Sequence, residues 1–305
     1  MLDSIVDSKT VVAGVDRRPA SELALTWAIR YAERYDFVLA VCHVVARPGN
    51  DDNGEDLLTV AARTARSQLP VERVQVILCH GSAAAELAAL AAPAGLLVVG
   101  GRARLTWADR RIGSTSLEAA VSARSPVVVV RPEIATPGPV PGAVLVGVDG
   151  SAAGRAALRF GFDHAERAGL PVAAAHVGTT DAGPYWFDQK LLETHFATEP
   201  AVLRLLDTET EPYRRHYPSV PVKLVALGGA PVEALAAASN GADLLVIGNA
   251  DGSPTHGRLG PVAYGLLSAA GCPVAVLRPP IAGVSGRSPL DADARVPDGV
   301  SSVWG

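Results

Sequence analysis

The sequence predicts an α/β protein made of two tandem open, doubly wound sheets, each of five parallel strands with helices on both faces. Three observations support this. The chain has 305 residues, about twice the length of a typical domain. Its two halves repeat each other. Within each half, short β-branched runs alternate with Ala-rich stretches of helical spacing, which is typical of parallel strands joined by crossover helices.

The repeat unit is a full domain. VVAGVD at 11–16 recurs as VLVGVD at 144–149, and His-Val at 43–44 recurs at 176–177, both 133 residues later. Ser-Pro-Val at 125–127 is echoed by Cys-Pro-Val at 272–274, which is 147 residues later. The second copy therefore holds 14 extra residues, around 181–188. A unit of this length excludes a short-period solenoid.

The positions of the elements follow from this alternation. In the first copy we expect strands near 10–16, 37–45, 73–79, 95–100 and 126–131, and helices near 20–34, 55–69, 83–92 and 114–123. In the second copy we expect strands near 143–149, 171–177, 221–227, 243–248 and 273–278. Leu23, Trp27 and Tyr31 recur every four residues, which predicts the apolar face by which the first helix lies on the sheet.

The domain boundaries are expected where Pro and Gly cluster. We expect a first domain at 1–135, a linker at 136–142, a second domain at 143–280 and a flexible tail at 281–305, rich in Gly, Ser, Pro and Asp. The extra segment of the second copy contains Tyr185, Trp186 and Phe187. We expect it to pack locally against that copy, with an interaction patch or a lid as the alternative.

Composition excludes several classes of function. The chain carries 27 Lys+Arg against 31 Asp+Glu, a net charge of -4, and so lacks the dense basic field of a nucleic-acid-binding surface. Cys42, Cys79 and Cys272 have no metal-ligand spacing and are expected to be buried small hydrophobes. The N-terminus has no basic start with an apolar block, and no apolar run approaches about 18 residues. A cytoplasmic location without membrane or nucleic-acid partners is therefore expected.

The chemistry is expected beyond the carboxyl ends of the strands, where open parallel sheets bind ligands. After the fourth strand the first copy has Gly100-Gly101, and further along the same loop Gly113-Ser114-Thr115 opens a helix. Glycine lets a ligand approach the backbone, and the free N–H groups at a helix start suit phosphate. The loop also contains four arginines, which either contact phosphate or form only a solvated face: Arg102, Arg104, Arg110 and Arg111.

These residues resemble the universal stress protein family. Its nucleotide-binding members carry the pattern G-x2-G-x9-G-[ST] after strand four, and an Asp that closes strand one, often followed by Gly-Ser. The first copy matches the pattern with Gly100, Gly113 and Ser114, but has Ala103 in place of the second glycine. It keeps the Asp as Asp16, although Arg17-Arg18 follow it.

The second copy keeps the part of the family pattern that the first copy has changed, and changes the part that the first copy largely keeps. Asp149-Gly150-Ser151 is intact after its first strand. Its later loop from Gly248 to Gly260 is one residue shorter, has Asp251 where the second glycine would be, and ends in Pro261 instead of a hydroxyl residue. Pro261 lacks one backbone donor, and Asp251 adds a negative charge.

The resemblance implies a fold similar to the adenine nucleotide alpha hydrolases. It also implies ATP with Mg2+ as cofactor, bound above all in the first domain, and pairing of the two fifth strands within the chain. Two tandem chains could associate further as a homodimer. The positions carried over as nucleotide-binding are Ala13, Gly14, Asp16, Val44, Gly100, Arg102, Ala103, Gly113, Ser114, Thr115, Gly147, Asp149, Val177, Gly248 and Gly260.

Structural interpretations of the same residues stay open. Asp16 and Asp149 could simply end a strand and cap the next helix. Gly113 and Gly260 could be turn residues, and Ser114 a helix cap. His43 and His176 recur without a nucleophile beside them, which favours a structural role.

Two functions from different classes remain. The first is an ATP-binding regulator of the stress response. The alternative is a nucleotide-independent interaction module of the same fold, favoured by Ala103, Arg17-Arg18 and Pro261. No paired carboxylates, metal cluster or base-activated nucleophile recurs, so no dedicated catalysis is expected beyond weak ATP hydrolysis.

Overall fold

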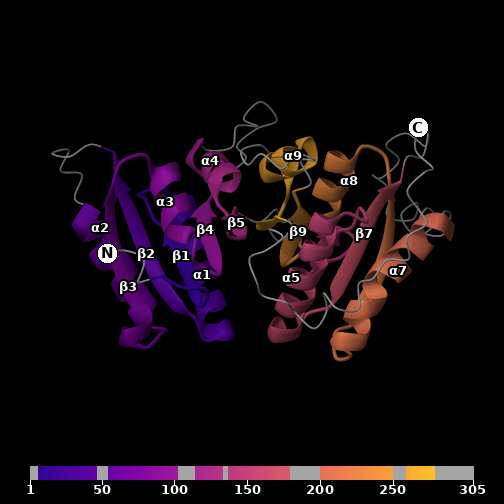
Figure 1. Cartoon of the computed structure of the whole chain (residues 1–305), viewed down its shortest axis with the longest axis horizontal. Coiled ribbons are helices and arrows are strands. Elements are labelled where there is room, and N and C mark those ends of the chain that lie inside the picture. The colour runs from indigo at the N-terminus through magenta and orange to yellow at the C-terminus, as the bar shows by residue number, and fades with distance from the viewer. Residues whose placement is uncertain are drawn as a thin grey trace.

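The computed structural model describes residues 6–46, 54–101, 114–132, 137–178, 200–249 and 259–278. The strands form one 10-stranded sheet in the order β3-β2-β1-β4-β5-β10-β9-β6-β7-β8 (Figure 1). The strands are β1 (Thr10–Gly14), β2 (Val38–Val45), β3 (Val74–His80), β4 (Leu96–Gly100), β5 (Val127–Val130), β6 (Val144–Gly147), β7 (Val172–Gly178), β8 (Val222–Gly228), β9 (Leu244–Gly248) and β10 (Val274–Leu277). Each expected strand is present within a few residues of its predicted bounds.

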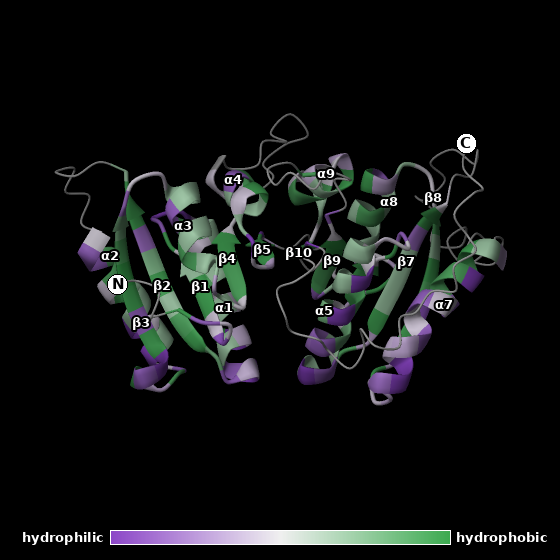
Figure 2. Ribbon diagram, viewed as in Figure 1, coloured by the Kyte–Doolittle hydropathy of each residue, from purple (hydrophilic) through white to green (hydrophobic). Residues whose placement is uncertain are grey.

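Helices cover both faces of the sheet. They are α1 (Pro19–Tyr35), α2 (Gly54–Arg66), α3 (Ala83–Ala91), α4 (Ser114–Ser122), α5 (Ala152–Ala168), α7 (Pro200–His216), α8 (Pro231–Ala238) and α9 (Pro261–Ala269). Buried residues of α1, α2, α5 and α7 form one hydrophobic core with one face of the sheet, and those of α3, α4, α8 and α9 form a second core on the other. Figure 2 shows hydrophobic residues running along the strands and hydrophilic ones on α2 and α7. The doubly wound α/β class is confirmed.

The two halves share a single sheet because β5 and β10 pair with each other. Within each half all strand pairs are parallel, whereas β10 runs antiparallel to β5, with Val274 opposite Val129 and Val276 opposite Val127. These are the strands that were expected to face each other. The two sheets predicted from the repeat are therefore continuous across the middle of the molecule.

The predicted orientation of α1 is wrong. Its sheet-facing stripe consists of small and branched residues such as Ala24, Ala28 and Ile29, all fully buried, while Leu23 is 41% exposed. Trp27 stacks on Tyr31 at 5.3 Å between ring centroids and faces α5 of the other half. The periodicity was misleading because α1 is buried on two sides, by the sheet and by the second half.

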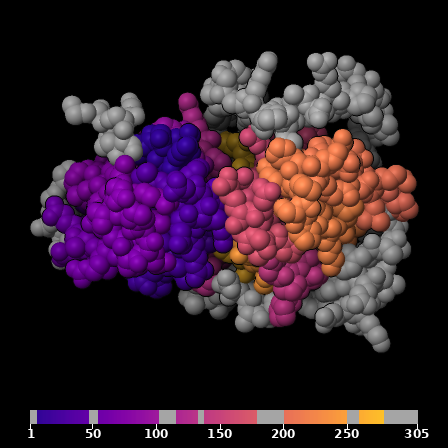
Figure 3. All heavy atoms as spheres, turned by 90° about the horizontal axis from the view of Figure 1, so that it is seen from below, coloured from indigo at the N-terminus to yellow at the C-terminus, as the bar shows by residue number. Residues whose placement is uncertain are grey.

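An aromatic contact between α1 and α5 joins the halves on this face, where Figure 3 shows them in direct contact. The Tyr35 hydroxyl lies 3.5 Å from Nδ1 of His164, which is 1% exposed, and Nε2 of His164 lies 3.3 Å from Oδ2 of Asp243. Arg167 lies over the Tyr35 ring. Burial raises the pKa of the Tyr35 phenol, and the nearby Tyr31 hydroxyl and Asp163 carboxylate raise it further. The Tyr35 hydroxyl therefore stays protonated and can donate to His164.

Two arginines that follow the paired strands reach across to the opposite half. Arg131, directly after β5, donates to the carbonyl of Leu267 in α9. Arg278, directly after β10, donates to the carbonyls of Ala120, at 3.2 Å, and Val121 in α4. Carbonyls in the last turn of a helix lack intrahelical donors and lie at the negative end of the helix dipole. Each guanidinium therefore donates hydrogen bonds to carbonyls that would otherwise lack them, and its positive charge suits the dipole. Arg-Pro follows the fifth strand in both copies, a signal that the sequence interpretation missed.

Two smaller expectations need correction or qualification. The helix expected at 55–69 ends at Arg66, and a short 3-10 turn at Val71–Arg73 follows, because Pro70 cannot continue a helix. The described part of the linker, 137–142, is docked on the second half: Gly138 N–H donates to the Asn240 carbonyl at 2.7 Å. The aromatic segment near 181–188 and the tail at 281–305 lie outside the described residues.

The three cysteines are buried and free, as predicted. Cys42 and Cys79 lie on neighbouring strands with their sulfurs 3.9 Å apart, and burial raises the pKa of the Cys42 thiol. None of the helices in the described ranges has the length and apolar character that crossing a membrane requires.

We predict that Arg278→Met lowers the free energy of unfolding by about 1–2 kcal/mol, because it removes a charged donor from two helix carbonyls. Urea unfolding followed by circular dichroism measures this. Arg63→Met, on the exposed side of α2, is the matched control and should cost less than about 0.5 kcal/mol. Equal stability of the two variants would show that the cross-half contact contributes nothing.

Candidate functional site

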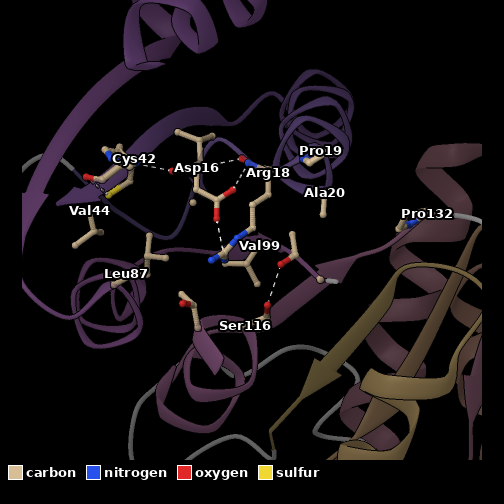
Figure 4. Close-up of a pocket in the computed structure, with 18 residues that line it drawn as sticks. Asp16, Arg18, Pro19, Ala20, Cys42, Val44, Leu87, Val99, Ser116 and Pro132 are labelled. Atoms are coloured by element: carbon tan, nitrogen blue, oxygen red, sulfur yellow. Dashed lines mark hydrogen bonds and ion pairs between the residues drawn. The ribbon is translucent and has the colours of Figure 1, made fainter. Parts of the chain in front are cut away.

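A cavity of about 480 Å³ opens at the carboxyl ends of β1, β2 and β4 in the first half (Figure 4). Strand order reverses between β1 and β4, so the cavity lies at the topological switch point of the parallel sheet. One wall is apolar and includes Val44, Leu87 and Val99. The cavity is therefore where the sheet topology predicts a ligand, with a surface able to accept an apolar ring.

Glycines keep this end of the sheet open and also let α1 approach it. A Cβ on Gly100 would lie 2.7 Å from the backbone carbon of Ala20, at the start of α1. Gly248, its counterpart, has the same relation to Ala153 at the start of α5, at 2.4 Å. The first glycine of the loop pattern is thus required for helix packing in both halves, whether or not a ligand is bound.

The loop between β1 and α1 is organised around Asp16. The Asp16 N–H donates to the Ser21 hydroxyl at 2.8 Å, and the Arg18 N–H donates to Oδ1 of Asp16 at 2.9 Å. The Arg18 guanidinium lies 3.3 Å from Oδ2 of the same carboxylate. Asp16 therefore shapes the turn at the end of the strand, as the structural interpretation allowed, while lining the cavity.

The first turn of α4 forms the opposite side of the cavity. Thr115 and Ser116 line it, and the Ser116 hydroxyl donates to the Gly100 carbonyl at 2.8 Å, which ties the start of α4 to the end of β4. First-turn N–H groups have no intrahelical acceptor, and the dipole is positive at this end. An anion in the cavity would be stabilised there.

The two recurring histidines act as supports for the strand ends. Nδ1 of His43 lies 2.8 Å from the Val15 carbonyl, and Nδ1 of His176 lies 2.6 Å from the Val148 carbonyl. In each half the ring therefore fixes the backbone just before the Asp. This matches the structural role that the sequence favoured.

The second half has the same scaffold but satisfies its own helix start. Oδ1 of Asn249, a residue 2% exposed, accepts the N–H of Gly260 at 2.8 Å. Pro261 is the first residue of α9 and has no N–H. Two donors at the start of α9 are thus unavailable to an anion. Residues 250–258 of this loop lie outside the described ranges, and Asp251 with them.

The structure brings only some of the expected residues together. Five line the cavity: Gly14, Asp16, Val44, Gly100 and Thr115. Ala13 belongs to the core shared with α1 instead, because side chains alternate along a strand. Ser114 begins α4, while Arg102, Ala103 and Gly113 lie outside the described residues. The second-half positions take equivalent places: Gly147 and Gly248 end strands β6 and β9, Asp149 follows β6, Val177 lies on β7 and Gly260 caps α9.

Sequence reasoning left most of the other cavity-lining residues unassigned, including four that bear on the chemistry of the site. Arg18 was noted only as a departure from Gly-Ser, and Ser21, Leu87 and Ser116 were not singled out. Ser116 could have been found, since it lies one residue beyond Gly-Ser-Thr. Ser21 and Leu87 carry no signal of their own until the helices are placed.

Comparison with known proteins decides the family. The model of the universal stress protein family matches residues 8–131 and again residues 142–278. The chain belongs to the universal stress protein family.

Other universal stress proteins share this tandem length. The chain is 28% identical over 294 residues to universal stress protein Rv2623 of Mycobacterium tuberculosis, covering 88% of this chain and 96% of that protein. It is 29% identical over 301 residues to a universal stress protein of Mycolicibacterium smegmatis, covering 88% and 97%. A crystal structure of a universal stress protein from Archaeoglobus fulgidus has a TM-score of 0.60 at 16% identity, covers 90% of this chain and 98% of its own, and supports the fold. Membership of this family supports a role in the stress response.

We predict that Gly100→Ala and Gly248→Ala each destabilise this universal stress protein by about 1–3 kcal/mol, because the new methyl group would meet helix backbone. Gly147→Ala is the matched control, since its Cβ would have its nearest neighbour at 3.4 Å, an ordinary contact. Thermal unfolding without ligand measures all three. A wild-type melting temperature for Gly100→Ala would show that this glycine serves the ligand alone.

Proposed function

We propose that this universal stress protein binds ATP in the cavity of its first half and acts as a stress-response regulator through that occupancy. The observation that carries the proposal is the cavity itself, which joins an apolar wall to the first turn of α4. Its volume of about 480 Å³ lies in the range of small-molecule sites. Val44 and Leu87 offer apolar contact to a base, and the α4 start suits phosphate.

Magnesium would enter with the phosphates. Mg2+ usually keeps several waters and is held by one or two carboxylates together with phosphate oxygens. Asp16 is the carboxylate among the described cavity-lining residues, and no cluster of three or more acidic, His or Cys side chains suited to a metal occurs in the described ranges. The residues therefore fit a metal carried by the nucleotide, with Asp16 as its protein ligand.

The second half supports a different use. Asn249 and Pro261 leave the start of α9 with fewer donors, and Glu209 pairs with Arg155 beside the loop that follows β6. We propose that this half serves as a nucleotide-independent interaction module, which gives one nucleotide per chain. The homodimer, the cytoplasmic location and the absence of dedicated catalysis stay predictions.

Thr115→Glu should abolish ATP binding without unfolding the protein. A carboxylate in the first turn of α4 suits the helix dipole but repels phosphate inside the cavity. Isothermal titration calorimetry should give one ATP per wild-type chain and an affinity loss of at least about 100-fold in the variant.

Val262→Glu places the same change at the equivalent position of α9 and is the matched control, with wild-type ATP binding expected. No saturable ATP binding by the wild-type protein would overturn the proposed function. Loss of ATP binding in Val262→Glu but not in Thr115→Glu would show that the site lies in the second half instead.

A further inference from the structure

The Arg18 side chain extends into the cavity of the first half. Figure 4 shows it leaving the loop after β1, passing the Asp16 carboxylate and reaching toward Val99, on the side where Ser116 lies. Among the described residues that line the cavity, Arg18 is the one Arg or Lys. A guanidinium therefore lies among the residues that line the cavity, beside the Asp16 carboxylate.

The repeat shows which residue would serve the fold better at this position. Ser151 is the counterpart of Arg18, and it caps α5: its hydroxyl accepts the Gly154 N–H at 2.9 Å and donates to Asp149 at 2.7 Å. Arg18 occupies the same cap position of α1 but makes no side-chain cap. A serine cap stabilises a helix by about 1 kcal/mol, so arginine here gives up stability at a position that faces a ligand cavity.

In the absence of ligand, the Arg18 side chain is held only weakly by its partner, Asp16. The Arg18 and Asp16 side chains are 63% and 45% exposed and meet through a single contact of 3.3 Å. Exposed pairs of this kind contribute little, because water screens them and two side chains must be ordered. A phosphate would offer two oxygens in the planar geometry that guanidinium prefers, which is a stronger interaction.

We propose that Arg18 is a phosphate ligand of the bound nucleotide and sets the preference of the site for phosphorylated nucleotides over nucleosides. This rests on the proposed function. It identifies the phosphates as the part of the nucleotide that Arg18 would contact. On binding, the guanidinium leaves Oδ2 of Asp16 for a phosphate oxygen, and the Arg18 N–H keeps Oδ1. No bond is made or broken, so the exchange needs no other reactant.

Arg18→Ser tests the proposal, because serine is the residue that the second half already accommodates at this position. Calorimetric titrations with ATP and with adenosine compare the variant with wild type. We expect ATP affinity to fall about tenfold and adenosine affinity to stay within about twofold, since only the phosphate contact is lost. Arg17→Ser removes a neighbouring charge that does not line the described cavity, and should keep the wild-type ATP affinity.

Each other outcome counts against the proposal. Unchanged ATP affinity in Arg18→Ser would show that Arg18 makes no contact with the nucleotide. Tighter ATP binding would show that Arg18 obstructs the cavity. Equal losses for ATP and adenosine would indicate a change of loop structure. Equal losses in Arg17→Ser would indicate general electrostatic attraction. If wild type binds ATP, these results overturn the role of Arg18 alone; if neither wild type nor Arg18→Ser binds ATP, the proposed function fails as well.

Discussion

The antiparallel pairing of β5 with β10 is the contact on which the rest of the structure depends. Each of these strands is four residues long and entirely apolar, VVVV and VAVL, and each would otherwise be an open edge of a five-stranded sheet. Open apolar edges promote association with other chains. Pairing within the chain removes both edges at once, brings α1 against α5, and places Arg131 and Arg278 within reach of the opposite helices.

The two halves share the residues that folding requires and differ at the places where the proposed ligand would bind. Gly100 and Gly248 are retained in both halves because helix backbone lies against them. His43 and His176 are retained because each fixes a strand end. The differences gather at the helix starts, where backbone donors either face a cavity or are satisfied by the chain itself. These departures change which backbone donors an anion could reach, and at Arg18 they remove the side-chain cap that Ser151 supplies in the other half.

The sequence predicted the strands closely because they are short runs rich in Val, Leu, Ile and Ala between turn signals, and each was seen twice. The orientation of α1 could not be predicted, since a single periodicity cannot describe a helix that is buried on two sides. The cavity position followed from topology and from Asp16 and Gly100. The roles of Ser21 and Leu87 could not be found, because they depend on how α1 and α3 approach the strand ends.

Helix α4 connects the site to the interface between the halves. Its first turn lines the cavity, and the carbonyls of Ala120 and Val121 near its other end accept hydrogen bonds from Arg278 of the second half. The contact with the second half therefore lies at the end of α4 opposite the turn that lines the cavity. The second half thus contacts the helix whose first turn lines the cavity, while the described residues that line the cavity all belong to the first half. The second half thereby supports the first half structurally, although two donors at the start of its own helix α9 are unavailable to an anion.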